Sequence, residues 1–568
     1  MPSLHHHAHT EIRLSPTRRT ILQQLSALGA LTAPPFALAS RLLQNRNSGM
    51  SMPGMASAPP SDKPAINGYS LTPFVDELPL FERAKPVSSL HPLNFRITMR
   101  EIHAKAHRDI PSTRMWSYGD TALAPLIDVR AHQPLQVEWV NHLPTQHFLP
   151  IDHSLHGCGH DVPDVRACVH LHGGRTPAKD DGYPEDWYVP GASRTCTYPL
   201  QQDATALWYH DHAMGLNRLN TYAGLFGMVL LRDDAEDALN LPSGKYEVPL
   251  LIYDRQFTTD GQLFYPDSGD PEHPWVPEFG GSCILLNGKM RPYFEVEPRL
   301  YRFRLLNTAN SSFFNLTLTN RQPFHQIGSD QGLLPTPVKM TNLLIAPAER
   351  ADLLIDFSQA AGQKIHIING AVQILEFRVA AKPSETASAS QSPRTSRVPN
   401  GISTSASIPS TLRTVDRIPE SAATVTRTVT LHEYFDKIGN SMLMLLNNKH
   451  WHEPVTETPR LNSTEIWEFI NLTEDTHPMH LHLVRFQVLD RRAFDVFKYQ
   501  NNQGTRYLAD ATPPDPNEMG WKDTVHCPAS TITRIIVRFD GYAGKYLYHC
   551  HILEHEANDM MRPFEVIA

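Results

Sequence analysis

Short apolar runs separated by turn residues recur along almost the whole of this 568-residue chain. Typical runs occupy residues 135–140, 301–306, 466–470 and 535–539, and several alternate apolar with polar positions. This alternation is expected of a strand with one buried face, whereas long stretches of helical periodicity are scarce. The 47 proline residues agree with it, because proline suits turns and sheet edges. The pattern predicts an all-β protein of sandwich type.

Length and composition narrow the class of protein further. The length corresponds to three or four domains, and 41% hydrophobic with 19% charged residues is enough for a substantial core. A formal net charge of −8 argues against nucleic-acid binding through charge. Six cysteines are too few for a small disulfide-stapled scaffold, and the sequence assigns no pairing among them. No apolar run reaches the length of a membrane span, so we expect none.

The first 39 residues have the layout of an export signal. Arg18 and Arg19 precede a mildly apolar stretch that ends at Leu38, and the small residues around it offer a cleavage site. This order matches a twin-arginine signal, which is read by an export machinery that carries folded proteins. We therefore expect a periplasmic or exported protein, in which the histidines upstream of Arg18 are removed with the signal.

Composition also divides the rest of the chain. Residues 40–66 are rich in Ser, Pro and Met and are predicted to be a linker. Residues 381–425 are rich in Ser, Thr, Ala and Pro and are predicted to be a disordered linker. With a softer boundary near residue 236, the predicted domains are 67–236, 237–380 and 426–568.

Histidine is the outlier in composition, with 30 residues. At this frequency about 1.6 His-x-His pairs arise by chance, so one pair means little. Four clusters in strand-like sequence carry such pairs together with distinct neighbours: 170–173, 210–212, 477–482 and 549–551. Residues i and i+2 of a strand point to one face about 6.5–7 Å apart, so paired imidazoles can bind neighbouring metal ions. The 450–452 pair is interpreted as surface or structural. The loop with His153, His156 and His160 could bind metal, but its irregular spacing favours a surface loop.

The last cluster can serve two metal sites at once. In His549-Cys550-His551 the two imidazoles face one side of a strand and the thiol faces the other. One strand can therefore hold a metal on each side, and the backbone through Cys550 gives a short covalent path for electrons between them.

A second ligand set surrounds Cys550. This residue supplies a thiolate, and His477 and His555 supply two imidazoles. Met560 adds a soft thioether, with Met561 as the rival one residue away. A trigonal set of two histidines and one cysteine with a weak axial methionine is the ligand set of a blue-copper electron-transfer site.

These segments resemble the multicopper oxidases, above all the bacterial branch that contains spore-coat laccase, bilirubin oxidase and phenoxazinone synthase (o-aminophenol oxidase). The resemblance runs from about residue 90 to the C-terminus, apart from 381–425, and includes segments 170–174, 346–350 and 549–556. It implies three cupredoxin-like domains, each a Greek-key sandwich or barrel, with a trinuclear copper cluster between the first and the third.

Carried over by motif position, the resemblance also implies a ligand set for four copper ions, with every ligand present. The type 1 copper takes His477, Cys550, His555 and Met560. The type 2 copper takes His170 and His480. The two type 3 coppers take His172, His210, His212, His482, His549 and His551.

The activity implied by the resemblance is that of a copper-dependent oxidoreductase. Donors lose electrons one at a time at the type 1 copper, and Cys550 passes the electrons to the trinuclear cluster, where O₂ is reduced to water. Because this reduction consumes protons, an acid is needed nearby, and Asp181 and Glu556 are the predicted catalytic acids. By resemblance, Glu556 lies where this branch places an acid near the O₂ channel. Each could instead be a solvated or capping carboxylate.

Three functions compete. The leading one is laccase-like oxidation of phenolic or aminophenolic aromatic donors. A periplasmic cuprous oxidase in copper tolerance is the alternative; Met50, Met52 and Met55 favour it, since thioethers suit Cu(I), but the third domain lacks a long Met-rich insertion. The complete ligand set disfavours a copper-free structural cupredoxin-repeat protein. Phenols, aminophenols, bilirubin and Cu(I) all stay open as donors, because the loops around a donor pocket vary most.

Overall fold

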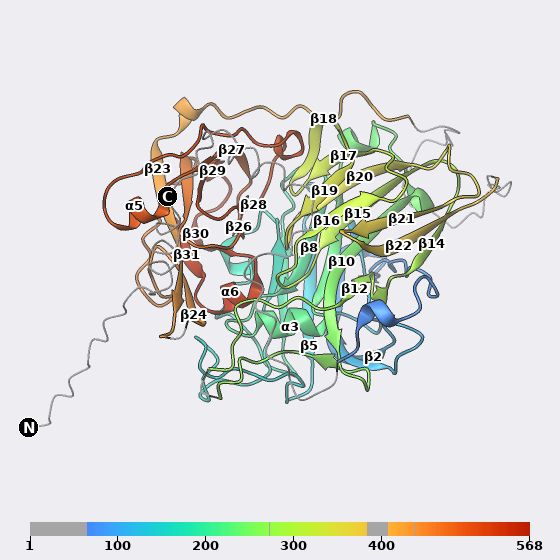
Figure 1. Cartoon of the computed structure of the whole chain (residues 1–568), viewed down its shortest axis with the longest axis horizontal. Coiled ribbons are helices and arrows are strands. Elements are labelled where there is room, and N and C mark those ends of the chain that lie inside the picture. Colours follow the sequence, from blue (N-terminus) through green and yellow to red (C-terminus); the bar gives the residue numbers. More distant parts are fainter. Residues whose placement is uncertain (1–64, 272, 383–406, 438) are drawn as a thin grey trace, which may run out of the picture.

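A computed structural model describes residues 65–271, 273–382, 407–437 and 439–568 (Figure 1). The predicted export signal and the Met50, Met52 and Met55 group lie outside these residues. Strands dominate the described part, whose longest helix, α3 (Asn217–Ala223), has seven residues, so the all-β prediction is confirmed. Among the described residues, no helix has the length and apolar character needed to cross a membrane.

The first unit consists of two sheets around a shared core. One sheet has the order β1-β2-β5-β7 with β3 beside β2, and its strands are β1 (Pro86–Ser88), β2 (His91–Ala104), β3 (Thr113–Ser117), β5 (Leu135–His142) and β7 (Ser193–Tyr198). The other has the order β4-β9-β8-β6, and its strands are β4 (Ile127–Arg130), β6 (Val169–His172), β8 (Thr205–Asp211) and β9 (Phe226–Arg232). The rings of Trp139 and Tyr209, one from each sheet, have centroids 5.0 Å apart. The two sheets thus pack as a sandwich.

The second unit repeats this arrangement. Its larger sheet contains β10 (Glu247–Phe257), β11 (Leu263–Phe264), β12 (Cys283–Leu286), β13 (Lys289–Met290), β15 (Leu300–Asn307), β17 (Phe324–Ser329), β18 (Gly332–Met340) and β20 (Arg350–Asp356). Its smaller sheet contains β14 (Tyr293–Val296), β16 (Phe314–Leu318), β19 (Asn342–Ile345), β21 (Lys364–Asn369) and β22 (Val372–Val379). Phe303 and Phe377 join the two sheets with ring centroids 5.3 Å apart.

The third unit lies on the left in Figure 1, coloured orange to red, opposite the second unit. One sheet contains β23 (Val425–Phe435), β24 (Ser441–Leu446), β25 (Thr464–Asn471), β27 (Phe486–Ala493) and β29 (Thr531–Arg538). The other has the order β28-β26-β30-β31, and its strands are β26 (His477–Leu481), β28 (Thr524–Cys527), β30 (Gly544–Cys550) and β31 (Met561–Val566). Trp467 and Tyr548 pack edge to face between them.

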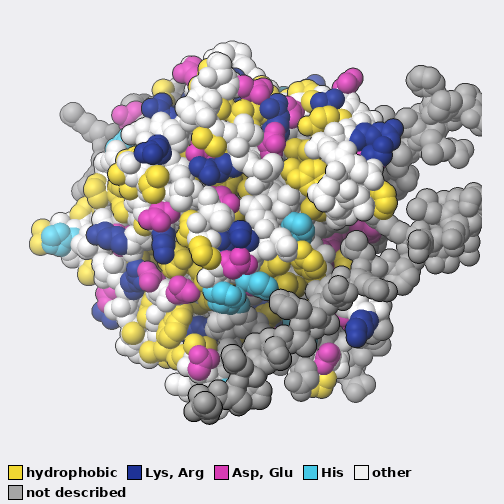
Figure 2. All heavy atoms as spheres, turned by 90° about the vertical axis from the view of Figure 1, so that its left-hand side faces the viewer, with side chains coloured by type: hydrophobic (Ala, Val, Ile, Leu, Met, Phe, Trp, Pro, Cys, Tyr) yellow, Lys and Arg dark blue, Asp and Glu magenta, His cyan; other side chains and the backbone are white. Residues whose placement is uncertain are grey.

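Short helices fill the connections. Besides α3 they are α4 (Asp234–Asp237), α5 (Val496–Gln500), α6 (Leu553–Ala557) and the 3-10 turns η2 (Gly68–Ser70), η3 (Ala178–Asp180), η4 (Gly244–Tyr246), η5 (Glu420–Ala422) and η6 (Pro516–Glu518). All six cysteines are buried, and none of them forms a disulfide in the described chain. On the face drawn in Figure 2, acidic and basic side chains are interspersed, with no large patch of one sign.

The predicted linker 381–425 is ordered in its second half. Residues 383–406 lie outside the described part, so disorder there stays a prediction. Residues 407–424, which we call the strap, run between the second and third units (Figure 1). Ile408 and Leu412 pack on a buried cluster of leucine and isoleucine side chains in the second unit. The Ser- and Pro-rich composition had hidden these two apolar anchors, and the prediction of disorder over the strap is wrong.

Polar contacts fasten the strap to the first and third units as well. Arg413 forms an ion pair with Asp203 of the first unit, 2.8 Å away. Further along, Arg417 donates a hydrogen bond to the Val488 carbonyl of the third unit at 2.8 Å. The strap therefore follows a fixed path between the sandwiches.

A buried ionic cluster joins the first and second units. Arg302 and Arg304 both contact Glu236 of α4, and both reach Asp352, at 2.6 and 2.8 Å. Arg304 also lies 2.9 Å from Glu247. Burial alone would raise the pKa of Glu247, but the neighbouring arginines hold it well below its usual range. Glu236 and Glu247 are therefore charged, and they depend on the neighbouring guanidinium groups.

The change Arg302→Met should destabilise the fold, because it takes from the buried carboxylates one of the arginines that pair with them. We expect a loss of about 3–5 kcal/mol, the usual cost of breaking a buried pair. Circular dichroism during heating should show a clearly lower unfolding midpoint. Arg96→Met is the control, since Arg96 is 57% exposed and 3.6 Å from Glu138, and should cost less than about 1 kcal/mol. Equal shifts for both variants would contradict this account.

Candidate metal centre

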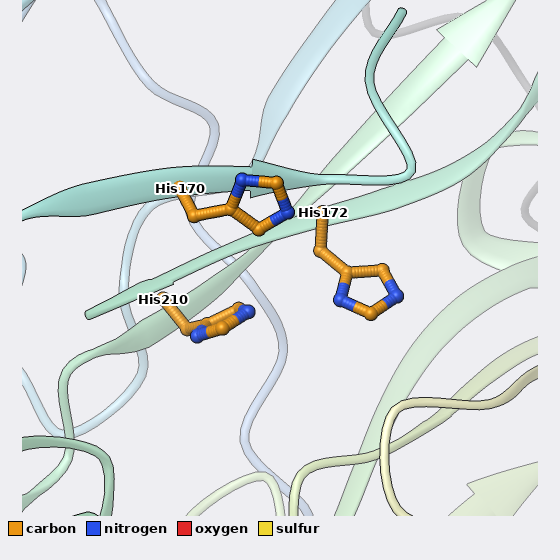
Figure 3. Close-up of side chains that lie close together, drawn as sticks. All are labelled: His170, His172 and His210. Carbon is orange, nitrogen blue, oxygen red and sulfur yellow. The ribbon is translucent and has the colours of Figure 1, made fainter. Parts of the chain in front are cut away.

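Two strands of the first unit bring histidines together. The register of β6 and β8 sets His170 opposite His210, and His172 follows on the same face of β6. Figure 3 shows the three rings pointing into one space between these strands, and one nitrogen from each lies within 4.8 Å of the others. His212 comes directly after β8, two residues beyond His210. The i, i+2 spacing along each strand, as predicted from the sequence, therefore brings these imidazoles to one face.

The third unit supplies the other half of the cluster. His480 of β26 is opposite His549 of β30, and His482 follows β26. The His170 and His482 rings stack across the two units with centroids 3.8 Å apart. One nitrogen each from His212, His482 and His549 lies within 4.8 Å of the others. We call the eight residues the histidine cluster: His170, His172, His210, His212, His480, His482, His549 and His551.

Unpaired ring nitrogens show that the histidine cluster fits metal ions. Six of the eight rings have a buried nitrogen without a hydrogen-bond partner in the described structure: His170, His172, His210, His212, His480 and His551. Such a nitrogen costs about 1–3 kcal/mol if nothing binds it. Burial, reinforced by neighbouring imidazoles, lowers the pKa of His170 well below its usual range. A neutral imidazole with a free nitrogen is the metal-binding form of histidine.

The opposite ring nitrogens are held by the backbone. His170 donates through Nδ1 to the Asp181 carbonyl at 2.5 Å, and His480 donates through Nδ1 to the Asp523 carbonyl at 2.8 Å. A hydrogen bond of this kind fixes the orientation of a ligating ring and leaves the other nitrogen for the metal.

A second group surrounds Cys550 on the other face of β30. The Cys550 sulfur lies 3.6 Å from His477 Nδ1 and 3.7 Å from His555 Nδ1, and the two nitrogens are 3.2 Å apart. All three residues are fully buried. This triangle of one sulfur and two nitrogens, which we call the thiolate group, fits the trigonal ligand set of a blue-copper site.

The register of β31 separates Met560 from Met561. Met561 is opposite His549, and opposite residues of an antiparallel pair share a face. A hydrogen bond of 3.0 Å from the Cys550 amide to the Met560 carbonyl extends this pairing by one residue. Met560 therefore lies on the Cys550 face, whereas Met561 packs in a separate buried cluster beside Trp451.

Comparison with known proteins settles the family. Models described as multicopper oxidase match residues 100–236 and 419–568. A laccase of Bacillus subtilis is 45% identical over 88% of this chain and 99% of its own. A laccase of Bacillus stratosphericus is 43% identical over 88% of this chain and all of its own. The chain belongs to the multicopper oxidase family.

Solved structures of this family have the same fold. The multi-copper oxidase of Pediococcus acidilactici matches with a TM-score of 0.69 at 25% identity, over 88% of this chain and 94% of its own. The McoA multicopper oxidase of Aquifex aeolicus matches with a TM-score of 0.69 at 28% identity, over 88% of this chain and all of its own. The three sandwiches of this oxidase are thus cupredoxin-like domains, and copper is the cofactor, with the family's four ions per chain.

Both predicted acids lie against the histidine cluster of the oxidase. Asp181 Oδ2 is 2.8 Å from His482 Nδ1, and burial raises the pKa of Asp181 well above its usual range. Glu556 Oε2 is 3.0 Å from His549 Nδ1, and Asn217 donates to Oε1 at 2.6 Å. Burial opposes ionisation of Glu556, but nearby imidazoles hold its pKa below the usual range. Neither carboxylate is solvated, because both are buried.

Sequence reasoning missed a third carboxylate at the cluster. Asp523 Oδ1 lies 3.2 Å from His172 Nε2. From the middle domain, Arg350 contacts both oxygens of Asp523, and Gln331 donates to Oδ2 at 2.6 Å. Despite burial, Arg350 lowers the pKa of Asp523. The middle domain, which contributes no histidine to the cluster, thus holds one of its rings in place.

Carboxylates also surround the outer edge of the thiolate group. Glu278 Oε1 is 3.5 Å from His555 Nε2, the ring nitrogen that faces away from Cys550. Burial, followed by the charges of Asp475 and Glu278, raises the pKa of Glu433 to about 7. Glu278, Glu433 and Asp475 come from separate parts of the chain and belong to no motif, so no sequence signal marked them.

The change Asp523→Asn should weaken metal binding at the histidine cluster but not at the thiolate group. It removes the charge that pairs with Arg350 and holds His172, and changes of this kind cost about 10- to 100-fold in metal affinity. Copper analysis after dialysis against a chelator should show fewer ions per chain, while the blue absorption of the thiolate group persists. Asp490→Asn is the control, because Asp490 pairs with Arg534 on another sheet. An unchanged copper content would contradict this role. A loss of copper accompanied by loss of the blue absorption would contradict it as well.

Proposed function

We propose that this oxidase acts as a laccase, taking electrons one at a time from phenolic or aminophenolic aromatic donors and reducing O₂ to water. One observation carries the proposal. Cys550 of the thiolate group is the last residue of strand β30 and lies in the chain between His549 and His551 of the histidine cluster. The close laccase relatives support the donor class.

The proposed ligands follow the two groups. His477, Cys550, His555 and Met560 would hold type 1 copper. His170 and His480 would hold type 2 copper, and His172, His210, His212, His482, His549 and His551 would hold the type 3 pair. Bound copper supplies the one-electron redox chemistry that the side chains lack.

The chain itself fixes geometry and excludes water. Cys550 and His549 are fully buried and adjacent, so the two ligand groups stay at one separation, joined by covalent bonds. Burial keeps solvent from both groups, and the backbone hydrogen bonds of the imidazoles keep their rings from turning. Little in this arrangement has to reorganise when charge moves through it.

Asp181 and Glu556 are the proposed catalytic acids. Burial raises the pKa of Asp181 well above its usual range, so its carboxyl holds a proton beside His482 more readily than an exposed aspartate does. Glu556 lies between His212 and His549, with Oε1 3.4 Å from His212 Nε2. The two carboxyl groups are thus placed to relay the protons that O₂ reduction consumes.

Glu278 is the proposed proton acceptor on the donor side. A phenol that has lost an electron is a strong acid, and the Glu278 carboxylate lies beside the outer nitrogen of His555. The acidic environment also favours donors that carry a positive charge or an N–H donor such as an aromatic amino group. It equally suits Cu(I), which is why a cuprous oxidase is the second candidate function.

Export to the periplasm through the twin-arginine machinery is part of the proposal. It rests on Arg18-Arg19 and the apolar stretch after them.

Oxygen uptake by the copper-loaded protein should be faster with a phenolic donor than with Cu(I) in the same buffer. The proposal expects sustained uptake with the phenol and no hydrogen peroxide. Cys550→Ser is the control, since it removes the thiolate and should abolish uptake with either donor. Oxygen uptake mainly with Cu(I) would indicate that the function is copper detoxification. No uptake with either donor by copper-loaded protein would contradict both candidate functions.

The change Glu278→Gln should selectively slow the oxidation of phenolic donors. Loss of a positioned base should lower kcat/KM for a phenol by about 100-fold, which is the lower end of the range of rate effects seen for general bases. Hexacyanoferrate(II), which has no proton to lose and is an anion, is the matched donor, and the variant should oxidise it at least as fast as the wild type. Steady-state kinetics with both donors provide the measurement. Equal slowing of both donors would contradict proton acceptance by Glu278.

A further inference from the structure

A second group of histidines lies outside the copper ligands, where loops of the first and third domains meet. It consists of His156, His450, His452 and Asp559, and we call it the interface cluster. The ring of His452 stacks nearly parallel to those of His156 and His450, with centroid distances of 5.9 and 5.8 Å.

One carboxylate faces two of these imidazoles. Asp559 Oδ2 lies 2.8 Å from His450 Nδ1, and Oδ1 lies 4.0 Å from His156 Nδ1. His450 and Asp559 are hydrogen-bonded to each other at 2.8 Å. Two ligand atoms on one zinc-sized ion are about 3.3 Å apart, so this pair has to open by about half an ångström to hold an ion. His156 is half-buried, and a small side-chain movement would bring its nitrogen within the same distance.

Buried packing and hydrogen bonds hold the scaffold beneath the interface cluster. Trp451, between the two histidines of its turn, is buried beside Met214 and Met561, and its Nε1 donates to Glu185 at 3.0 Å. Arg562 donates to the carbonyls of His450 and Trp451. Because the tryptophan points inward, the flanking imidazoles are both turned to the surface.

Asp559 is fixed as well. Its backbone has a φ of 68°, in the left-handed region that aspartate tolerates better than most residues. Its side chain is only 8% exposed, whereas that of His450 is 45% exposed. A buried carboxylate thus lies beneath a row of accessible imidazoles.

This donor set suits one class of ligand. Imidazoles with a carboxylate prefer divalent transition-metal ions such as Zn²⁺ and Cu²⁺, whereas Ca²⁺ and Mg²⁺ prefer oxygen ligands alone. We propose that His156, His450, His452 and Asp559 bind one such ion in addition to the four copper ions. The bound ion would join a loop of the first domain to two turns of the third, and so stabilise the contact between them.

Zinc binding to the copper-loaded, full-length protein tests this proposal. His5, His6, His7 and His9 are changed to Ala in every protein compared, so that the N-terminal histidines cannot contribute. Equilibrium dialysis against Zn²⁺ with elemental analysis should show one zinc more per chain than in the double variant His156→Ala/His452→Ala. Each single change should weaken zinc binding at least about tenfold.

Thermal unfolding gives an independent readout. A ligand that binds only the folded state raises its stability, so zinc should raise the unfolding midpoint of the parent protein but not that of the double variant. His160→Ala is the control, an exposed histidine of the same loop, and should keep both effects. Copper content and blue absorption verify that each variant is folded. Equal zinc binding in parent and double variant, or equal loss in His160→Ala, would overturn the proposal.

Discussion

Alternation of side chains along β30 is the constraint on which both metal-binding groups depend. It turns Cys550 to one face and His549 to the other, and the pairing with β26 sets Met479 and His480 opposite them. A slip of one residue in this register would exchange the two faces. The strand is therefore held from both sides, by β26 and by β31. The thiolate group and the histidine cluster share one backbone, so neither can move without the other.

The middle domain stabilises the histidine cluster without supplying any of its imidazoles. Arg350 reaches into the contact between the first and third domains and holds Asp523, which in turn contacts His172. Lys522 continues this network to Glu349, 2.9 Å away. Buried ion pairs of this kind contribute little net stability. Their effect is to fix relative positions, and in a cluster assembled from two domains that positioning is what metal binding requires.

Features that reside in local sequence could be predicted. Pairs such as His170 and His172 follow from strand periodicity, and Cys550 with its neighbours indicates two ligand groups on one strand. Motif position favoured Met560 over Met561, and the register of β31, which sets Met561 opposite His549, gives the physical reason. The sequence left Asp181 and Glu556 open as capping or solvated carboxylates, and burial against the imidazoles removes the solvated alternative.

Features created by distant contacts could not be predicted. His172 and Asp523 are 351 residues apart in sequence, and Glu278 reaches His555 from a loop without any motif. The strap was predicted to be disordered because its composition is mostly polar, and its two apolar anchors, Ile408 and Leu412, are too few to change that composition. His450 and His452 were interpreted as surface residues, and only the fold shows that His156 and Asp559 lie beside them. Composition and periodicity report on neighbours along the chain, whereas these sites depend on neighbours in space.

The account's central claim is that electrons reach the histidine cluster through Cys550. Anaerobic stopped-flow mixing of copper-loaded protein with an aromatic donor tests it most directly, with the oxidation state of the cluster followed spectroscopically in wild type and in Cys550→Ser. The account predicts that the variant keeps copper at the histidine cluster, and that this copper stays oxidised long after the wild-type cluster is reduced. Reduction of the cluster at the wild-type rate in the variant would contradict it.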